Sequence, residues 1–461
     1  MSQPKTEEAA APGGPPGRPS ARQGWREIGR SLAHRNFRLF FGGQTISLLG
    51  TWMQSTAMTW LVYRLSKEQG RDSAFLLGIT NFAGQIPVLL LGLFAGVYSD
   101  RWDRRRIIVA TQTLSMIQAF LLGFLTVTQL ITIDQLIVLC FCLGCINAFD
   151  MPTRQAFMTE IVDSSGDLPN AIALNSSMVN GARLLGPSIA GMIISVVGEA
   201  ICFLVNGVSF LFVIAALLAM KLAPRPPKTS HGSVMGGLHE GFVYAFGFAP
   251  VRAILLLVAL TGLVGMPYVV LLPIFAGDIL HGDARTFGFL AGASGVGALT
   301  GSLYLASRST VVGLGRWIAG TAATFALSLI AFSYSTNLLL SMAILCVAGF
   351  SIIVQLAASN TILQTIVQEQ KRGRVMSLYT VAFLGMAPLG SLIAGDLASR
   401  IGTENTVRLG GGVCLVGAAL FARQLPKIRQ IVRPIYTQMG ILPAAAAGIQ
   451  AATGETAPPE R

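Results

Sequence analysis

An apolar run at residues 76–98 ends in a short basic segment at residues 99–106, and a second apolar run begins at Ile107. Runs of this length are typical of membrane-spanning helices, which need about 20 apolar residues to cross the hydrocarbon. Because the joining segment is so short, the two spans must fold back on each other as a helical hairpin. The segment holds four arginines, which the positive-inside rule places on the cytoplasmic side. The sequence therefore predicts a polytopic protein of the cell inner (plasma) membrane.

The composition indicates a membrane protein rather than a nucleic-acid-binding protein. Of the 461 residues, 52% are hydrophobic and 12% are charged, whereas about 25% of the residues in a soluble domain are charged. The formal net charge of +12 would favour nucleic-acid binding in a soluble chain. Here the basic residues lie between apolar runs, so membrane topology explains them. We expect the lipid bilayer as a partner and no nucleic acid.

All six cysteines lie inside apolar runs. The spacing Cys140-x-Cys-x-x-Cys145 resembles a metal cluster at first sight. On a helix, however, these thiols point to different faces, and no histidine accompanies them. We interpret the cysteines as buried small hydrophobic residues. The sequence predicts no metal site and no cofactor.

Twelve apolar runs are long enough to span a membrane. They predict an all-α integral membrane protein in which twelve transmembrane helices form two six-helix, pseudo-symmetric bundles. The predicted spans are 38–64, 76–99, 107–128, 135–158, 169–197, 200–220, 253–276, 286–306, 316–334, 338–366, 375–398 and 405–422.

A polar stretch rich in proline and glycine lies between the sixth and seventh spans and divides the chain into two halves. Lysines and arginines gather in the even-numbered loops and in the tails, so both termini should be cytoplasmic. The predicted organisation is a disordered cytoplasmic tail at 1–35, an N-terminal bundle at 36–222, a cytoplasmic linker at 223–250, a C-terminal bundle at 251–425 and a largely disordered cytoplasmic tail at 426–461.

The two halves share short sequence matches. Leu185-Gly186-x-x-Ile189-Ala190-Gly191 recurs 204 residues later as Leu389-Gly390-x-x-Ile393-Ala394-Gly395. Ile161-Val162 recurs at nearly the same offset as Ile366-Val367. Internal duplication of this kind indicates a central cavity and alternating access, the arrangement of many secondary carriers.

The segment between spans two and three reads Gly96-x-x-x-Asp100-Arg101-x-Asp103-Arg104-Arg105. It resembles the G-x-x-x-D-R-x-G-R-R signature of the major facilitator superfamily, with Asp103 where glycine is usual. The resemblance implies that Asp100 faces the start of helix eleven near Arg374 and latches the cytoplasmic side shut. It also implies that Arg104 pairs with Glu160. The predicted cytoplasmic gate is Gly96, Asp100, Arg101, Arg104, Glu160 and Arg374; retention of basic residues on the cytoplasmic side is the alternative explanation.

The fifth span carries Ala173-x8-Ala182-x3-Gly186-Pro187-x-x-Ala190-Gly191. This resembles the antiporter motif of superfamily exporters, G-x8-G-x3-G-P-x-x-G-G, with alanine at three glycine positions. Small residues at this spacing allow close helix packing, and Pro187 allows a bend. We therefore single out Gly186, Pro187 and Gly191, with packing alone as the alternative interpretation.

Within the superfamily, residues 36–423 resemble the branch that contains macrolide efflux pumps and the enterobactin exporter. The resemblance rests on residues 47–54 (SLLGTWMQ), 149–156 (FDMPTRQA) and 372–377 (RGRVMS). Some relatives carry an acid after the glycine of helix one, where this chain has Thr51. That difference moves the predicted proton-coupling site to Asp150.

Away from the helix ends, the charged residues of the spans are Asp150, Arg154 and Arg183. A charge at the bilayer centre costs about 2.5–3.5 kcal/mol, so each should be paired or face a wet cavity. Asp150 and Arg154 lie four residues apart on one helix face, and Arg183 could meet Asp150 near mid-membrane. In one interpretation Asp150 titrates and its proton alternates with the substrate. In the other, the charges form a static ion pair.

Polar residues also follow helical spacing in the first two spans. They form one stripe on span one and a second on span two, and we expect both to line the substrate cavity rather than only join helices. Tyr268 could add an aromatic wall, and the internal offset places Gln355 opposite Asp150. The predicted cavity residues are Gln44, Ser47, Thr51, Gln54, Asn81, Gln85, Tyr268 and Gln355.

These features favour a monomeric secondary active transporter that exports an amphipathic small molecule, of the drug or siderophore class, against inward proton movement. The chain has no G-x-x-x-x-G-K-[ST] phosphate loop for ATP hydrolysis. Import or lysophospholipid transport on the same fold are alternatives, and a non-transporting receptor or a membrane enzyme are more remote ones. The four histidines lie in tails or loops, which argues against an enzyme.

Overall fold

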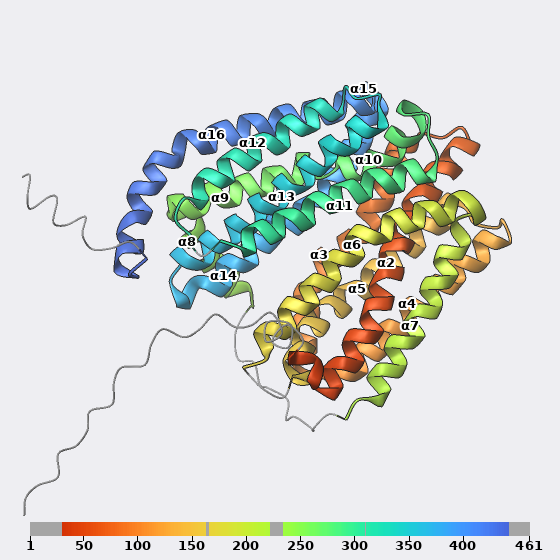
Figure 1. The fold of residues 1–461 in the computed structure, drawn as a ribbon, viewed down its shortest axis with the longest axis horizontal. Helices are drawn as coiled ribbons and strands as arrows, with labels where there is room; N and C mark the ends of the chain where they lie inside the picture. Colours follow the sequence, from red (N-terminus) through yellow and green to blue (C-terminus); the bar gives the residue numbers. More distant parts are fainter. Residues whose placement is uncertain (1–29, 163–165, 222–233, 309, 442–461) are drawn as a thin grey trace, which may run out of the picture.

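The computed structural model describes residues 30–162, 166–221, 234–308 and 310–441, although the side chains of residues 93, 94, 96–101 and 234–240 lie outside this description. Every regular element within these ranges is helical, as predicted. Figure 1 shows two bundles that meet where α10 and α15 are labelled and diverge toward α8 and α14. The all-α fold class is confirmed.

The first bundle contains six long helices that follow a short 3-10 turn at Arg30–Ala33 (η1). In this bundle α2 packs against α6 and α7, α3 packs against α5, and α4 packs against α5 and α7. The helices are α2 (Arg35–Glu68), α3 (Ser73–Arg101), α4 (Arg104–Val127), α5 (Ile133–Ile161), α6 (Leu168–Val197) and α7 (Glu199–Ala219).

The second bundle also contains six long segments, two of which are interrupted by π-helical turns. Its segments are α9 (Ala249–Leu260) joined through η2 (Thr261–Gly265) to α10 (Tyr268–Ile274) and η3 (Phe275–Ile279), α11 (Ala284–Ala306), α12 (Leu314–Phe332), α13 (Leu338–Ile366), α14 (Glu369–Thr380) joined through η4 (Val381–Gly385) to α15 (Met386–Ile401), and α16 (Thr403–Gln438).

Eleven helical segments of the described chain are long and apolar enough to cross a membrane. The twelfth long segment, α2, has 34 residues and packs among the others. A stripe of polar residues, Gln44, Ser47, Thr51 and Gln54, interrupts its apolar sequence. We call the end of the molecule at which α2, α4 and α14 begin the basic end, because the cluster at Arg104–Arg106 lies there.

Two regions contain more helix than the sequence predicted. The predicted linker holds α8 (Val234–Gly247), which packs against α14. The last span was predicted to end at 422, but α16 continues to Gln438. Ile428 and Val432 are buried four residues apart on one face of this extension, which explains why the first part of the predicted disordered tail is helical.

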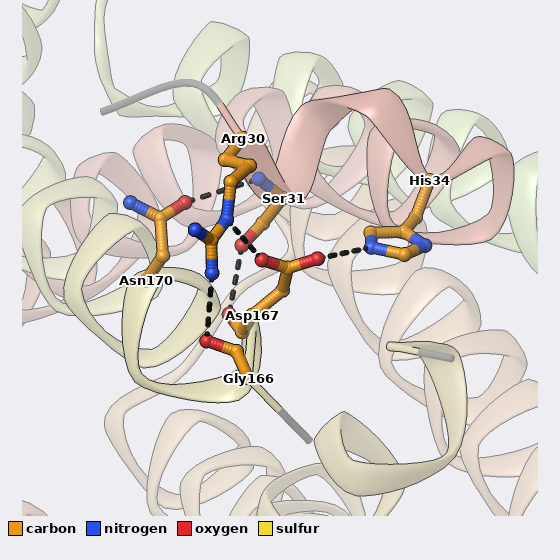
Figure 2. Close-up of polar contacts among 6 residues, drawn as sticks. All are labelled: Arg30, Ser31, His34, Gly166, Asp167 and Asn170. Carbon is orange, nitrogen blue, oxygen red and sulfur yellow. Dashed lines mark hydrogen bonds and ion pairs between the residues drawn. The ribbon is translucent and has the colours of Figure 1, made fainter. Parts of the chain in front are cut away.

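The start of the first bundle was also predicted as disordered tail, yet residues 30–34 are bound to the start of α6 (Figure 2). Arg30 pairs with Asp167 and donates to the carbonyl of Gly166 at 3.0 Å. His34 Nε2 lies 2.9 Å from Asp167 Oδ2. Ser31, which is fully buried, donates from its backbone N to Asn170 Oδ1 at 3.1 Å. These contacts around one carboxylate order the segment that precedes α2.

The two bundles touch through glycines at the end opposite the basic end. A Cβ added to Gly78 of α3 would lie 2.6 Å from the carbonyl oxygen of Ser391 in α15. A Cβ added to Gly191 of α6 would lie 2.5 Å from the carbonyl oxygen of Ala284 in α11. The backbones of the two bundles therefore approach closely at these two crossings, which only glycine permits without a shift.

The crossing of α6 and α11 can be tested with one methyl group. Gly191→Ala should lower the free energy of unfolding by about 1–3 kcal/mol, because overpacking forces a backbone shift. Gly181→Ala on the same helix is the matched control, since a Cβ there meets nothing within 4 Å. Chemical unfolding in detergent measures both variants. Equal stability losses would contradict the close crossing.

The Asp167 cluster predicts a pH-dependent contribution to stability. Hydrogen bonds from His34 and Arg30 lower the pKa of Asp167. The contribution is therefore complete above the unfolded pKa of about 3.9 and is lost as the pH falls through the lower folded pKa. Asp167→Asn should lower Tm at pH 7, and its difference from the unsubstituted protein should shrink in strong acid. A difference that does not change with pH in thermal unfolding would contradict this assignment.

Candidate functional site

A cavity of about 580 Å³ lies within the first bundle. Its volume falls in the range of about 300–1,000 Å³ typical of small-molecule sites. Its lining comes from α2, α3, α4, α5, α6 and α7, and the second bundle adds only Val270 of α10 and Leu384 of η4. The cavity is therefore almost entirely a feature of one bundle.

Five of the eight predicted cavity residues line this space. They come from the polar stripes of α2 and α3, and are Gln44, Thr51, Gln54, Asn81 and Gln85. Because these side chains recur every three or four residues, one face of each helix turns toward the cavity. The polar stripes of α2 and α3 thus face this cavity, and its role as the substrate site stays a prediction.

The other three predicted residues lie outside the lining. Ser47 is buried against neighbouring helices at 2% exposure. Tyr268 lies in the core of the second bundle, with its hydroxyl 3.0 Å from Ser294 Oγ. Gln355 is fully buried and donates to Thr261 Oγ1 at 3.0 Å. The two residues of the second bundle join helices to one another, which is why they do not face the cavity.

Gln54 both lines the cavity and joins helices. Its Nε2 donates to Gln118 Oε1 of α4 at 2.9 Å, and its Oε1 accepts from Asn206 Nδ2 of α7 at 2.7 Å. Gln54, Gln118 and Asn206 are each buried. This amide chain satisfies polar groups that would be costly alone in the membrane. On α3, Gln85 donates to Asn81 in the same way.

Asp150 of α5 lies behind the cavity wall and is only 1% exposed. It forms an ion pair with Arg154 on the next turn of the same helix. Its Oδ1 lies 2.8 Å from Thr111 Oγ1 and 2.9 Å from Gln112 Nε2, both on α4. Arg154 and Gln112 line the cavity, whereas Asp150 does not. The carboxylate thus holds Arg154 at the edge of the cavity from behind.

Arg183 does not join this pair, contrary to the predicted meeting with Asp150. Its guanidinium carbon lies 5.3 Å from the centroid of the Trp52 ring on α2. The physical reason is that α6 packs against α2 and α11 and has little contact with α5. A cation over an aromatic face is a favourable alternative to an ion pair.

The predicted gate is described only in part. The side chains of Gly96, Asp100 and Arg101 lie outside the described residues, so the latch stays a prediction. The Arg104–Glu160 ion pair is present, with 2.8 Å between Nη1 and Oε1, and it joins α4 to α5. Arg374 of α14 packs against α8. A Cβ added to Gly241 of α8 would lie 2.9 Å from the Cβ of Arg374.

The antiporter-like motif of the fifth span, Gly186, Pro187 and Gly191, lies on α6 between the two bundles. A Cβ on Gly186 would lie 2.5 Å from the Cβ of Trp52 in α2. The carbonyl oxygen of Pro187 and the backbone of Gly191 both face Gly288 of α11. The motif therefore lets α6 approach α2 on one side and the second bundle on the other, in line with the packing interpretation.

Side-chain contacts that the sequence did not predict join the bundles at the end opposite the basic end. Tyr63 of α2 donates to Asp278 Oδ1 at 2.7 Å, and Lys67 Nζ lies 2.7 Å from Asp278 Oδ2. Trp60 stacks on Phe287 of α11 at a centroid distance of 6.0 Å. Tyr63 and Asp278 are 215 residues apart, so no local sequence pattern indicates the pair.

The sequence also missed much of the cavity lining. Asn147 and Gln155 of α5, and Asn175 of α6, all line the cavity. Asn147, Met151 and Gln155 recur every four residues on α5, and this spacing is the signal that would have found that face.

Two helix bundles in contact at one end, with a cavity of mixed polar and apolar lining among membrane-length helices, define a multi-pass membrane transporter. The family described as "Transmembrane secretion effector" matches residues 30–435. The chain therefore belongs to this family, within the major facilitator superfamily, and the resemblance inferred from its motifs is confirmed. Members of this superfamily are transporters, which decides against the enzyme alternative.

Two similar proteins align with this chain over nearly the whole of their own length. One is the staphyloferrin A transporter of Staphylococcus aureus, 24% identical over 397 residues, which covers 85% of this chain and 97% of that protein. The other is the multidrug efflux pump Tap of Mycolicibacterium fortuitum, 26% identical over 393 residues, which covers 83% of this chain and 93% of that protein.

A solved structure supports the fold. The bacterial homolog of the human lysosomal transporter Spinster, in an inward-facing and unoccupied conformation, aligns with a TM-score of 0.67 at 15% identity. The alignment covers 85% of this chain and 98% of that one. At this identity the likeness shows the shared architecture alone.

Loss of the Asp278 carboxylate should loosen the contact opposite the basic end. Lys67 and Asp278 are partly exposed, so their pair is worth at most about 1 kcal/mol, or about fivefold in an opening equilibrium. Asp278→Asn should therefore speed backbone amide exchange across residues 275–290 by up to about fivefold. Asp396→Asn is the control, since it removes an ion pair within α15 only. Unchanged exchange in Asp278→Asn would contradict the closing role.

Proposed function

We propose that the chain is a secondary active exporter that moves amphipathic small molecules out of the cell against inward proton movement. The observation that carries this proposal is the cavity of about 580 Å³, which mixes polar and apolar walls. Contacts that close the opposite end supply the second element of alternating access, a gate on one side of the site. A single chain supplies the whole lining, so we propose a monomer as the transport unit.

The orientation follows from charge. The basic end carries Arg104–Arg106 and the arginines near the start of α14. We propose that the protein lies in the inner (plasma) membrane of the cell. Because positive residues stay on the cytoplasmic side, the basic end and both termini then face the cytoplasm. The bundles diverge toward this end (Figure 1), so the described form is the inward-facing one.

The Asp150–Arg154 pair offers a way to couple protons to cargo. In the described form Arg154 is held at the cavity edge by the carboxylate behind it. Protonation of Asp150 would remove the partner charge and release the guanidinium toward the space that cargo occupies. Proton and cargo would then exclude one another, which is the requirement for antiport. The static ion pair remains the competing interpretation.

The direction of transport rests on similar proteins and on the sequence motif. The multidrug pump Tap is named for efflux, and the fifth span resembles the antiporter motif of superfamily exporters. An importer would use the same cavity with the opposite coupling, so the sign of gradient-driven flux separates the two.

The coupling can be tested in proteoliposomes with N-acetyl-dansylcadaverine as a fluorescent neutral cargo. The unsubstituted protein should accumulate the probe in an acidic lumen when its basic end faces outward. Asp150→Asn should lower this gradient-driven accumulation by a factor of at least about ten, because the carboxylate that exchanges a proton is gone. Probe exchange at equal pH on both sides should persist when Arg154→Gln is combined with Asp150→Asn, because no released guanidinium then enters the cargo space.

Asp134→Asn is the matched control for this experiment, since Asp134 lies exposed at the other end of the same helix. It should keep the accumulation of the unsubstituted protein. Full gradient-driven accumulation in Asp150→Asn would remove Asp150 from the coupling mechanism, and accumulation only with an alkaline lumen would contradict export.

A further inference from the structure

The cavity lining contains one charged side chain, Arg154, among the residues that the structure describes. No aspartate, glutamate or lysine of the described chain borders this space. A second arginine, Arg183, lies behind the Trp52 wall with its guanidinium over the indole ring. Asp150, which pairs with Arg154, lies behind the wall, so the pair is neutral overall but turns its positive end toward a molecule inside the cavity.

This charge disfavours positively charged cargo. Like charges repel at the wall of this cavity more than they do in bulk water, because the effective dielectric constant near protein is lower. A cation would also lose its hydration without gaining an acidic partner in the lining. The positive end of the Asp150–Arg154 pair therefore disfavours the binding of organic cations.

A negatively charged cargo gains little from the same arginine. Asp150 already holds the guanidinium of Arg154. An anion that drew Arg154 away would leave Asp150, at 1% exposure, as a buried carboxylate without its ion-pair partner, which is strongly destabilising. The pair therefore discriminates against both signs of charge.

The rest of the lining suits an uncharged molecule that forms hydrogen bonds. Gln44, Asn147, Gln155 and Asn175 line the cavity, and none of them has a side-chain hydrogen bond within the described part of the chain. Amides of this kind supply both donors and acceptors. Apolar walls lie between them, from Leu48, Met58 and other side chains.

We propose that the cavity binds uncharged, amphipathic molecules that carry several hydrogen-bonding groups, and that Arg154 is the residue that makes it reject organic cations. This inference rests on the proposed transport function and adds the charge class of the cargo. Asp150 acts on this selectivity through Arg154, as a positioning residue.

The proposal can be tested by measuring the binding of three probes that share the dansyl fluorophore and differ in charge. Dansylcadaverine is a cation, its N-acetyl derivative is neutral, and its N-succinyl derivative is an anion. Each is titrated against the protein in nanodiscs, with empty nanodiscs as the blank. The neutral probe should bind at least about tenfold more tightly than the cation and more tightly than the anion.

Arg154→Gln should raise the affinity for the cation by at least about tenfold, because Asp150 is then left without its positive partner, while the affinity for the neutral probe changes much less. Should this variant fail to fold, the double variant Asp150→Asn with Arg154→Gln removes both charges and should still bind the cation more tightly than the unsubstituted protein. Arg408→Gln is the matched control, since Arg408 lies over Tyr334 in the second bundle and should leave the probe order unchanged.

Equal affinity for cation and neutral probe in the unsubstituted protein would overturn the proposal, as would an unchanged cation affinity when Arg154 is removed. Tighter binding of the anion than of the neutral probe would overturn the assignment to uncharged cargo. Absence of binding by all three probes would also overturn it, whereas gradient-driven flux would still decide separately whether the chain transports.

Discussion

A polar side chain in the hydrocarbon of a membrane needs a hydrogen-bond partner or a water-filled space. That constraint organises the first bundle. Gln54, Gln118 and Asn206 satisfy one another across α2, α4 and α7, while Gln44 and Thr51 on the same face of α2 border the cavity. The polar stripe of α2 therefore both joins the helices of the first bundle and shapes the site.

The two bundles use the same topology for different purposes. In the first, the middle of α5 carries the Asp150–Arg154 pair beside a cavity. In the second, the corresponding position on α13 holds Gln355, which bonds to Thr261 within a packed core. All three π-helical turns lie in the second bundle among the residues that the structure describes. Charge and cavity are thus concentrated in one half, and the other half serves as the surface against which it closes.

Much of this architecture could be predicted from residue patterns that are local in the chain. Apolar runs of membrane length predicted the helices, and the basic segment after residue 98 predicted the first hairpin. The Arg104–Glu160 pair was implied by the family resemblance and is present. Helical spacing also predicted that Gln44, Thr51 and Gln54 share a face.

The remaining features depend on which helices touch, and local patterns do not contain that information. Arg183 lies over Trp52 because α6 packs on α2 rather than on α5. Thr111 and Gln112 reach Asp150 because α4 packs against α5. The contact of Tyr63 with Asp278 exists because the bundles are closed at that end.

The central claim is that the two bundles move against each other around the cavity of the first. Double electron–electron resonance between spin labels at Thr159 of α5 and Gln370 of α14 tests it most directly. Both residues are exposed near the basic end, and they lie in different bundles. A second pair at Gln69 and Glu404 reports on the opposite end. Lowering the pH should shorten the first distance and lengthen the second. If neither distance changed under any condition, the account would be contradicted.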